Sequence, residues 1–70
     1  MLIERIEEER KRKGMSLEEL AHMVGVTKQS YLNWKNGAKV PAVKLAEIAK
    51  VLNCSTDYLL GLTDQKKITA

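Results

Sequence analysis

Apolar residues recur along this chain at the spacing of an α-helix. Stretches in which apolar positions fall three or four residues apart alternate with short polar or glycine-containing segments. Signals for β-strands are nearly absent, and the Asn-Gly pair Asn36-Gly37 follows a helical pattern instead of joining two alternating runs. The sequence therefore predicts an all-α, compact five-helix domain. The expected helices cover residues 2–13, 17–24, 27–36, 41–52 and 56–60.

Residues that begin or end helices stand at the edges of these stretches. Ser16 and Glu19 are spaced as a capping box, in which each side chain binds the backbone N–H of the other residue. Thr27 is a suitable N-cap for the third helix and Ser55 for the fifth. Pro41 suits the first position of the fourth helix. Residues that accept a left-handed backbone follow the helix ends, at Gly14, Gly25, Gly37, Asn53 and Gly61.

The apolar positions also predict which side of each helix is buried. The fourth helix carries most of them and is expected to be central. In the third helix, Tyr31 and Trp34 point inward, and Cys54 stands where a small apolar residue packs. The other residues that we expect to be buried in helices two and four are Leu20, Ala21, Met23, Val24, Val43, Leu45, Ala46, Ile48, Ala49, Val51 and Leu52.

Composition limits the classes of protein to be considered. A chain of 70 residues makes one domain, which we place at residues 1–62, with a polar and mobile tail at residues 63–70. One cysteine and one histidine are too few for an internal disulfide or a structural zinc site, and they suit a reducing, cytoplasmic setting. No apolar run approaches the length of a membrane span. We expect no enzyme, cofactor or small-molecule ligand, because the sequence has no nucleophile–base pair or phosphate-cradling glycine loop.

The charges are unevenly distributed. The net charge is only +3, but residues 20–46 contain four lysines and no acidic residue. A segment with charges of one sign is typical of a surface that binds a polyanion, although a solvated lysine-bearing surface gives the same pattern.

Residues 17–36 together have the features of a helix-turn-helix. Ala21 is small where two steeply crossing helices approach each other, and Gly25 supplies the positive φ that the turn requires. Apolar residues on both sides of the turn would pin the two helices to the rest of the fold. These are Leu20, Val24, Val26, Tyr31 and Trp34.

The chain resembles the Cro and phage-repressor family of helix-turn-helix domains over about residues 3–62. The resemblance implies the family's lambda-repressor-like five-helix fold and its role as a dimer on operator DNA. The stretches that carry it are Arg10…Lys13-Gly14-Met15-Ser16, Glu18-Glu19-Leu20-Ala21, Val24-Gly25-Val26-Thr27, Trp34…Asn36-Gly37, Pro41 and Ser55-Thr56-Asp57-Tyr58-Leu59-Leu60-Gly61.

The third helix is then the recognition helix, whose N-terminal outer residues reach base edges in the major groove. With Tyr31 and Trp34 turned inward, its outer face presents Lys28, Gln29 and Asn33. Gln29 has the donor and acceptor that the edge of adenine requires, Lys28 can reach guanine acceptors or a phosphate, and Asn33 suits either contact. We predict that these three residues read bases.

Contacts to phosphates are expected around this face. Hydroxyl and lysine side chains suit them, and so do the backbone amides of Gly37 and Ala38 in the loop after the recognition helix. The predicted phosphate-contacting residues are Thr27, Ser30, Lys35, Asn36, Lys39 and Lys44.

Three positions depart from the family's pattern. Leu17 stands where the family often has a glutamine that touches a phosphate, and Glu9 stands where relatives usually have an apolar residue. Lys35 stands where the family often has an acid that pairs with Arg10, so these two residues would repel each other. We expect that Glu7 or Glu9 receives Lys35 instead.

The resemblance implies a transcriptional regulator, expected to be a repressor, that binds a near-palindromic operator in double-stranded DNA as a homodimer. Tyr58, Leu59 and Leu62 form a small apolar group near the end of the chain and are the expected dimer surface, although they would equally serve to close the core. The alternative function is a protein-interaction or antitoxin-type module, whose DNA binding is secondary.

Overall fold

The computed structural model describes residues 3–66, which contain five α-helices. They are α1 (Glu4–Arg12), α2 (Leu17–Met23), α3 (Lys28–Lys35), α4 (Ala42–Leu52) and α5 (Thr56–Leu59), with no strand among the described residues. The predicted all-α, five-helix architecture is confirmed, and every helix begins and ends within two residues of its expected bounds. Residue 2 of the first expected helix and residues 67–70 of the expected tail lie outside the described part.

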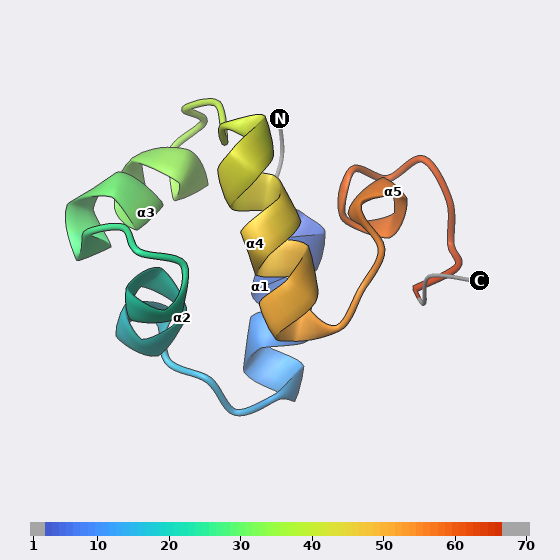
Figure 1. The fold of residues 1–70 in the computed structure, drawn as a ribbon, viewed down its shortest axis with the longest axis horizontal. Coiled ribbons are helices and arrows are strands. Elements are labelled where there is room, and N and C mark those ends of the chain that lie inside the picture. The colour runs from blue at the N-terminus through green and yellow to red at the C-terminus, as the bar shows by residue number, and fades with distance from the viewer. Residues whose placement is uncertain (1–2, 67–70) are drawn as a thin grey trace.

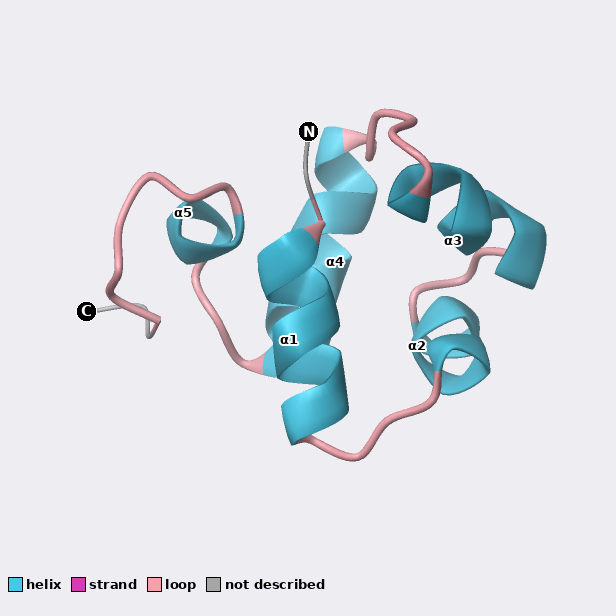
Figure 2. Ribbon diagram, turned by 180° about the vertical axis from the view of Figure 1, so that it is seen from behind, coloured by secondary structure: helices cyan, strands magenta, loops and turns pink. Residues whose placement is uncertain are grey.

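The helix α4 stands at the centre of the fold. It packs on α1, α2 and α5, and α1 lies behind it in Figure 1 and in front of it in Figure 2. On one side of this central pair lie α2 and α3, and on the other side lies α5 (Figure 1). Because α3 stands at the outer edge and packs mainly on α2, much of its surface faces solvent.

The predicted capping residues begin their helices. Ser16 and Glu19 form a reciprocal capping box with two 3.0 Å hydrogen bonds. The hydroxyls of Thr27 and Ser55 accept backbone N–H groups at the starts of α3 and α5. Pro41 is the N-cap of α4 with an extended backbone, ψ 145°, so the prediction that it is the first helical residue is wrong by one position.

The core is built mainly on one side of α4. Its buried residues are spaced three or four positions apart, and Tyr31, Trp34 and Cys54 are buried as predicted. Three residues expected in the core are exposed instead: Met23, Val43 and Ala46. Val43 lies two positions before the buried residue Leu45, which is about 200° around the helix and hence on the solvent side. The buried residues of α4 are Leu45, Ile48, Ala49 and Leu52.

A carboxylate from α1 joins this helix to α3. Glu7 accepts a hydrogen bond of 2.6 Å from the hydroxyl of Tyr31 and one of 2.8 Å from Nε of Arg10. The ammonium group of Lys35 lies 3.4 Å from the same carboxylate. The expected new partner of Lys35 is therefore Glu7 and not Glu9, and Arg10 and Lys35 share one acid instead of repelling each other.

Ionisation of Glu7 is coupled to this arrangement. Burial disfavours its charged form, but the hydrogen bonds from Arg10 and Tyr31, the charge of Arg10 and the contact with Lys35 together outweigh burial and lower its pKa to about 2. Burial, reinforced by the hydrogen bond to Glu7, raises the pKa of Tyr31, so its hydroxyl stays a donor.

A second carboxylate of α1 ties the end of the described chain to the fold. Glu9 is 4% exposed and lies 3.4 Å from both the Tyr58 hydroxyl and the Lys66 ammonium. Arg5 donates hydrogen bonds to the carbonyls of Tyr58 and Thr63, at 2.9 and 2.6 Å. Within the expected tail, residues 63–66 contact α1 and α5 through these side chains.

The Glu7 cluster predicts how stability depends on pH. Because the pKa of Glu7 in the folded state, about 2, is below its ordinary value of 4.5, its contribution is present above pH 4.5 and is lost as pH falls toward 2. Wild-type stability should fall over this range by roughly 3 kcal/mol at most through this group. Glu7→Gln should be less stable at pH 7 and should lack this part of the decrease, as measured by urea unfolding followed by Trp34 fluorescence. Glu8→Gln, at an exposed position of α1, is the control. Equal pH dependence in Glu7→Gln and wild type would contradict the assignment.

Candidate nucleic-acid interface

The turn between α2 and α3 has the geometry that the sequence predicted. Gly25 adopts φ +73°, and the next residue, Val26, donates its N–H to the carbonyl of Ala21 at 2.9 Å. Ala21 is buried where the two helices approach each other. The two helices and this turn form a helix-turn-helix.

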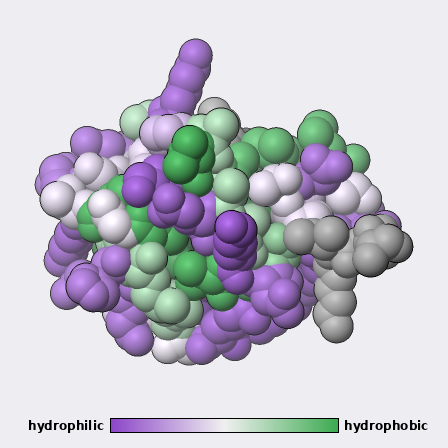
Figure 3. All heavy atoms as spheres, in the orientation of Figure 1, coloured by the Kyte–Doolittle hydropathy of each residue, from purple (hydrophilic) through white to green (hydrophobic). Residues whose placement is uncertain are grey.

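The inner face of α3 is anchored. Tyr31 is fully buried, Trp34 is 6% exposed, and their ring centroids lie 5.8 Å apart. The opposite face carries Lys28, Gln29 and Asn33, all of them exposed. Figure 3, drawn in the orientation of Figure 1, shows mostly hydrophilic atoms over the side of the molecule that α2 and α3 occupy.

The three predicted base readers are close to one another and to α2. Gln29 donates its amide N–H to the side-chain oxygen of Asn33 at 3.0 Å, one helical turn away. Gln29 keeps its own oxygen and a second N–H, which together match the acceptor and donor that the edge of adenine requires. The ammonium of Lys28 lies 3.8 Å from Glu18, at the start of α2, with both side chains more than half exposed. This contact was not anticipated, because the acid belongs to a different helix.

The hydroxyls of Thr27 and Ser30, both predicted to contact phosphates, form hydrogen bonds within the protein. Thr27 accepts the N–H of Ser30 at 3.1 Å and donates its own hydroxyl to the side-chain oxygen of Ser30 at 3.0 Å. Ser30 retains its hydroxyl proton for another acceptor.

The loop after α3 does not offer the backbone amides that the sequence suggested. The N–H of Gly37 donates to the backbone carbonyl of Trp34 at 3.1 Å, and the N–H of Ala38 donates to the backbone carbonyl of Asn33 at 2.9 Å. These amides close the end of α3, so the prediction that they form part of a phosphate clamp is wrong. The side chains of Asn36 and Lys39 are exposed in this loop.

Two of the predicted phosphate-binding lysines contact protein groups. The side chain of Lys35 is 40% exposed and faces Glu7. The ammonium of Lys44, on the first turn of α4, donates to the carbonyl of Val24 at 2.9 Å and lies 3.4 Å from Glu47. No pattern in the sequence indicates the contact with Val24, because its acceptor is a backbone atom 20 positions away.

The predicted dimer residues are divided between the core and the surface. Tyr58 and Leu59 are 6% and 2% exposed within the single chain. Leu62 is 73% exposed, and Leu60, which the prediction left out, is 44% exposed. Figure 3 shows hydrophobic atoms at the upper edge of the molecule, on the α5 side.

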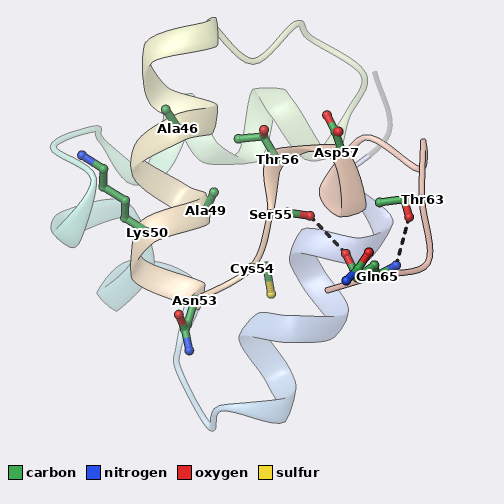
Figure 4. A pocket seen from close by; sticks show the side chains of 10 residues that line it. All are labelled: Ala46, Ala49, Lys50, Asn53, Cys54, Ser55, Thr56, Asp57, Thr63 and Gln65. Atoms are coloured by element: carbon green, nitrogen blue, oxygen red, sulfur yellow. Dashed lines mark hydrogen bonds between the residues drawn. The ribbon is translucent and has the colours of Figure 1, made fainter. Parts of the chain in front are cut away.

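A wide groove lies away from α3. It measures about 890 Å³ and is enclosed by the end of α4, the start of α5 and residues 63–65 (Figure 4). Its lining is mixed: Ala46 and Ala49 on one wall, Ser55 and Gln65 on the other, where the Ser55 hydroxyl donates to the Gln65 carbonyl. Within residues 3–66, no group of three or more His, Cys, Asp or Glu side chains could hold a metal ion, and no helix is long and apolar enough to cross a membrane.

Comparison with known sequences identifies relatives over most of the chain. The sequence pattern of a family described as helix-turn-helix matches residues 6–59. The chain is 37% identical over 65 residues to an uncharacterized HTH-type transcriptional regulator of Bacillus subtilis, YobD, covering 91% of this chain and 58% of that protein. It is 34% identical over 68 residues to the transcriptional regulator AnsR of the same organism, covering 96% and 59%. The chain thus spans less than two thirds of the length of these relatives.

Solved structures share the fold. The Bacillus subtilis biofilm regulator SinR, in complex with DNA, superposes with a TM-score of 0.76 at 34% identity, covering 86% of this chain and 98% of that one. The P22 c2 repressor, in complex with a synthetic operator, superposes with a TM-score of 0.78 at 32% identity, covering 90% and 98%. The chain therefore belongs to the helix-turn-helix family, and within it to the Cro and phage-repressor type that its sequence resembles.

Proposed function

We propose that this chain binds double-stranded DNA sequence-specifically through α3 and regulates transcription, as a repressor that covers its operator. The observation that carries the proposal is the division of α3 into two faces. Tyr31 and Trp34 anchor one face, while Lys28, Gln29 and Asn33 stand exposed on the other. The DNA complexes of SinR and the P22 c2 repressor, which have this fold, support the same role. A regulator of this kind acts in the cytoplasm and carries no catalytic activity.

Affinity would come largely from lysines that displace counterions from phosphates. Lys39 is exposed and lies in the segment of residues 20–46, which contains no acidic residue. The pairs Lys28–Glu18 and Lys35–Glu7 must loosen or share their lysines on binding. The Lys28–Glu18 pair is highly exposed, and such pairs contribute at most about 1 kcal/mol, so a phosphate or guanine can compete for Lys28.

The proposed assembly is a homodimer. Two recognition helices related by a two-fold axis would enter the major groove about 34 Å apart, one turn of DNA, on a near-palindromic operator. Leu60 and Leu62 supply the exposed apolar area for the contact, while Tyr58 and Leu59 support it from the core.

The same two leucines favour a second candidate function. A protein-interaction or antitoxin-type module would use Leu60 and Leu62 to bind a different protein, with DNA binding secondary. It predicts weak DNA binding without a preferred sequence, whereas the DNA-reading proposal predicts a defined motif.

Selection of bound sites from random duplex DNA at two salt concentrations tests the proposed function. A dimeric reader should enrich a near-palindromic motif, and its affinity should fall steeply as salt increases, since lysine–phosphate contacts release counterions. A pool without any motif at either salt concentration would reject sequence-specific reading and favour the interaction module.

Gln29 should determine one base position in that motif. Gln29→Ala removes the donor–acceptor pair and should cost about 1–3 kcal/mol at a single position, where base preference relaxes. Competition binding with single-base variants of the selected site measures this effect. Gln65→Ala is the matched control and should bind like wild type, because Gln65 is exposed and belongs to the segment after α5, which lies on the side of α4 opposite to α3 (Figure 1). A uniform loss across all base variants in Gln29→Ala would speak against base reading.

Leu62 should contribute to the dimer. Leu62→Lys places a charge in the exposed apolar contact and should weaken self-association by about tenfold or more, because burial of a lysine ammonium without a partner is costly. Sedimentation equilibrium measures the dissociation constant. Met23→Lys, at an exposed position of α2 far from α5, is the control. The surface is wrongly assigned if both variants associate like wild type.

A further inference from the structure

The side chain of Lys44 crosses from α4 to the turn of the helix-turn-helix. Its ammonium donates to the carbonyl of Val24, the C-cap of α2, at 2.9 Å. It also lies 3.5 Å from the position that a Cβ atom on Gly25 would occupy, so it sits directly beside the left-handed residue of the turn. On its other side Glu47 lies 3.4 Å away and holds the ammonium in place.

This contact satisfies a group that the turn leaves open. The backbone N–H groups of Gly25 and Val26 donate to the carbonyls of His22 and Ala21, and these two hydrogen bonds close the end of α2. The carbonyl of Val24 accepts a hydrogen bond from the Lys44 ammonium. A cation at the C-terminal end of a helix also interacts favourably with the helix dipole.

We propose that Lys44 is a positioning residue for DNA reading. Its hydrogen bond holds the turn of the helix-turn-helix against α4 and so fixes the position of the start of α3. The carbonyl it holds belongs to Val24, only three residues before the N-cap Thr27. Lys44 thus adds a direct link from α4 to the turn before α3, beside the packing of α4 on α2. This role rests on the proposed DNA-binding function, and it replaces the phosphate contact that the sequence suggested for Lys44.

The surroundings of Lys44 distinguish it from a phosphate-binding lysine. Its side chain is 29% exposed and faces two protein acceptors, whereas Lys39 is exposed in the loop after α3. Two of the three N–H donors of its ammonium are taken by Val24 and Glu47, so a phosphate could take only the third.

The first test concerns the turn itself and needs no DNA. Lys44→Met keeps most of the aliphatic stem and removes the donor, and should raise hydrogen exchange of the Val26 amide about tenfold, because the turn opens more often. Lys44→Gln, whose amide is too short to reach the carbonyl, is the second variant in case the thioether disturbs folding. Lys39→Met is the matched control and should leave Val26 exchange unchanged.

The second test compares binding to the selected site with binding to a scrambled duplex over a range of salt. Lys44→Met should weaken specific binding about tenfold while the salt dependence keeps its slope, since no phosphate contact is lost. Lys39→Met should instead weaken binding to both duplexes similarly. It should also reduce the slope of the salt dependence by about one. Gly25→Ala strains the same turn at φ +73° without removing a charge, and should reproduce the Lys44→Met pattern.

The two tests separate this proposal from the function on which it rests. Unchanged Val26 exchange, or a loss of about one in the salt slope of Lys44→Met, would overturn the positioning role. Faster exchange with unaltered specific binding would overturn it as well. If wild type binds neither duplex, the proposed function fails, and Val26 exchange alone then decides whether Lys44 holds the turn.

Discussion

The placement of α3 depends on the ionised carboxylate of Glu7, which joins α1 to α3. This group receives the hydroxyl of Tyr31 at 2.6 Å and the guanidinium of Arg10 at 2.8 Å, and it faces Lys35 at 3.4 Å. Hydrogen bonds to a charged acceptor are shorter and stronger than those between neutral groups. Because Tyr31 and Lys35 lie one helical turn apart on α3, a single acid of α1 holds two points of the helix. Arg10 extends the link to the carbonyl of Met15, just before α2 begins.

Several groups that the sequence suggested as DNA contacts also form contacts that hold α3 in the fold. Lys35 and Lys44 contact α1 and the turn, Thr27 caps α3, and the amides after α3 close its end. In the proposed function, DNA would therefore meet the side chains exposed on the first two turns of α3 and in the loop that follows. The helix α3 is thereby held from three directions: by α1, by α2 and, through the turn, by α4.

At the other end of the molecule, Glu9 and Arg5 perform a similar task for the C-terminal segment. Glu9 replaces the apolar residue expected from the family, yet it is buried and joins Tyr58 to Lys66. Arg5 stacks on the Tyr58 ring, 4.5 Å from its centroid, while it binds the carbonyl of Thr63. These contacts complete the core around α5 and leave Leu60 and Leu62 as its exposed apolar residues.

The local features of this protein follow from its sequence alone. Helical periodicity gave the five helices, and short-range chemistry gave the capping box at Ser16, the N-cap Thr27 and the turn at Gly25, because each depends on residues within one helical turn. The inward direction of Tyr31 and Trp34 followed from the same periodicity, and with it the outward face of Lys28, Gln29 and Asn33. The contact partners of the charged side chains, in contrast, depend on how the helices pack in three dimensions. The partners that Lys44, Glu9 and Arg5 have outside their own helices lie 20 to 59 positions away along the chain. A long flexible side chain meets whichever element folding brings beside it, and its partner is often a backbone atom whose identity no residue type reveals.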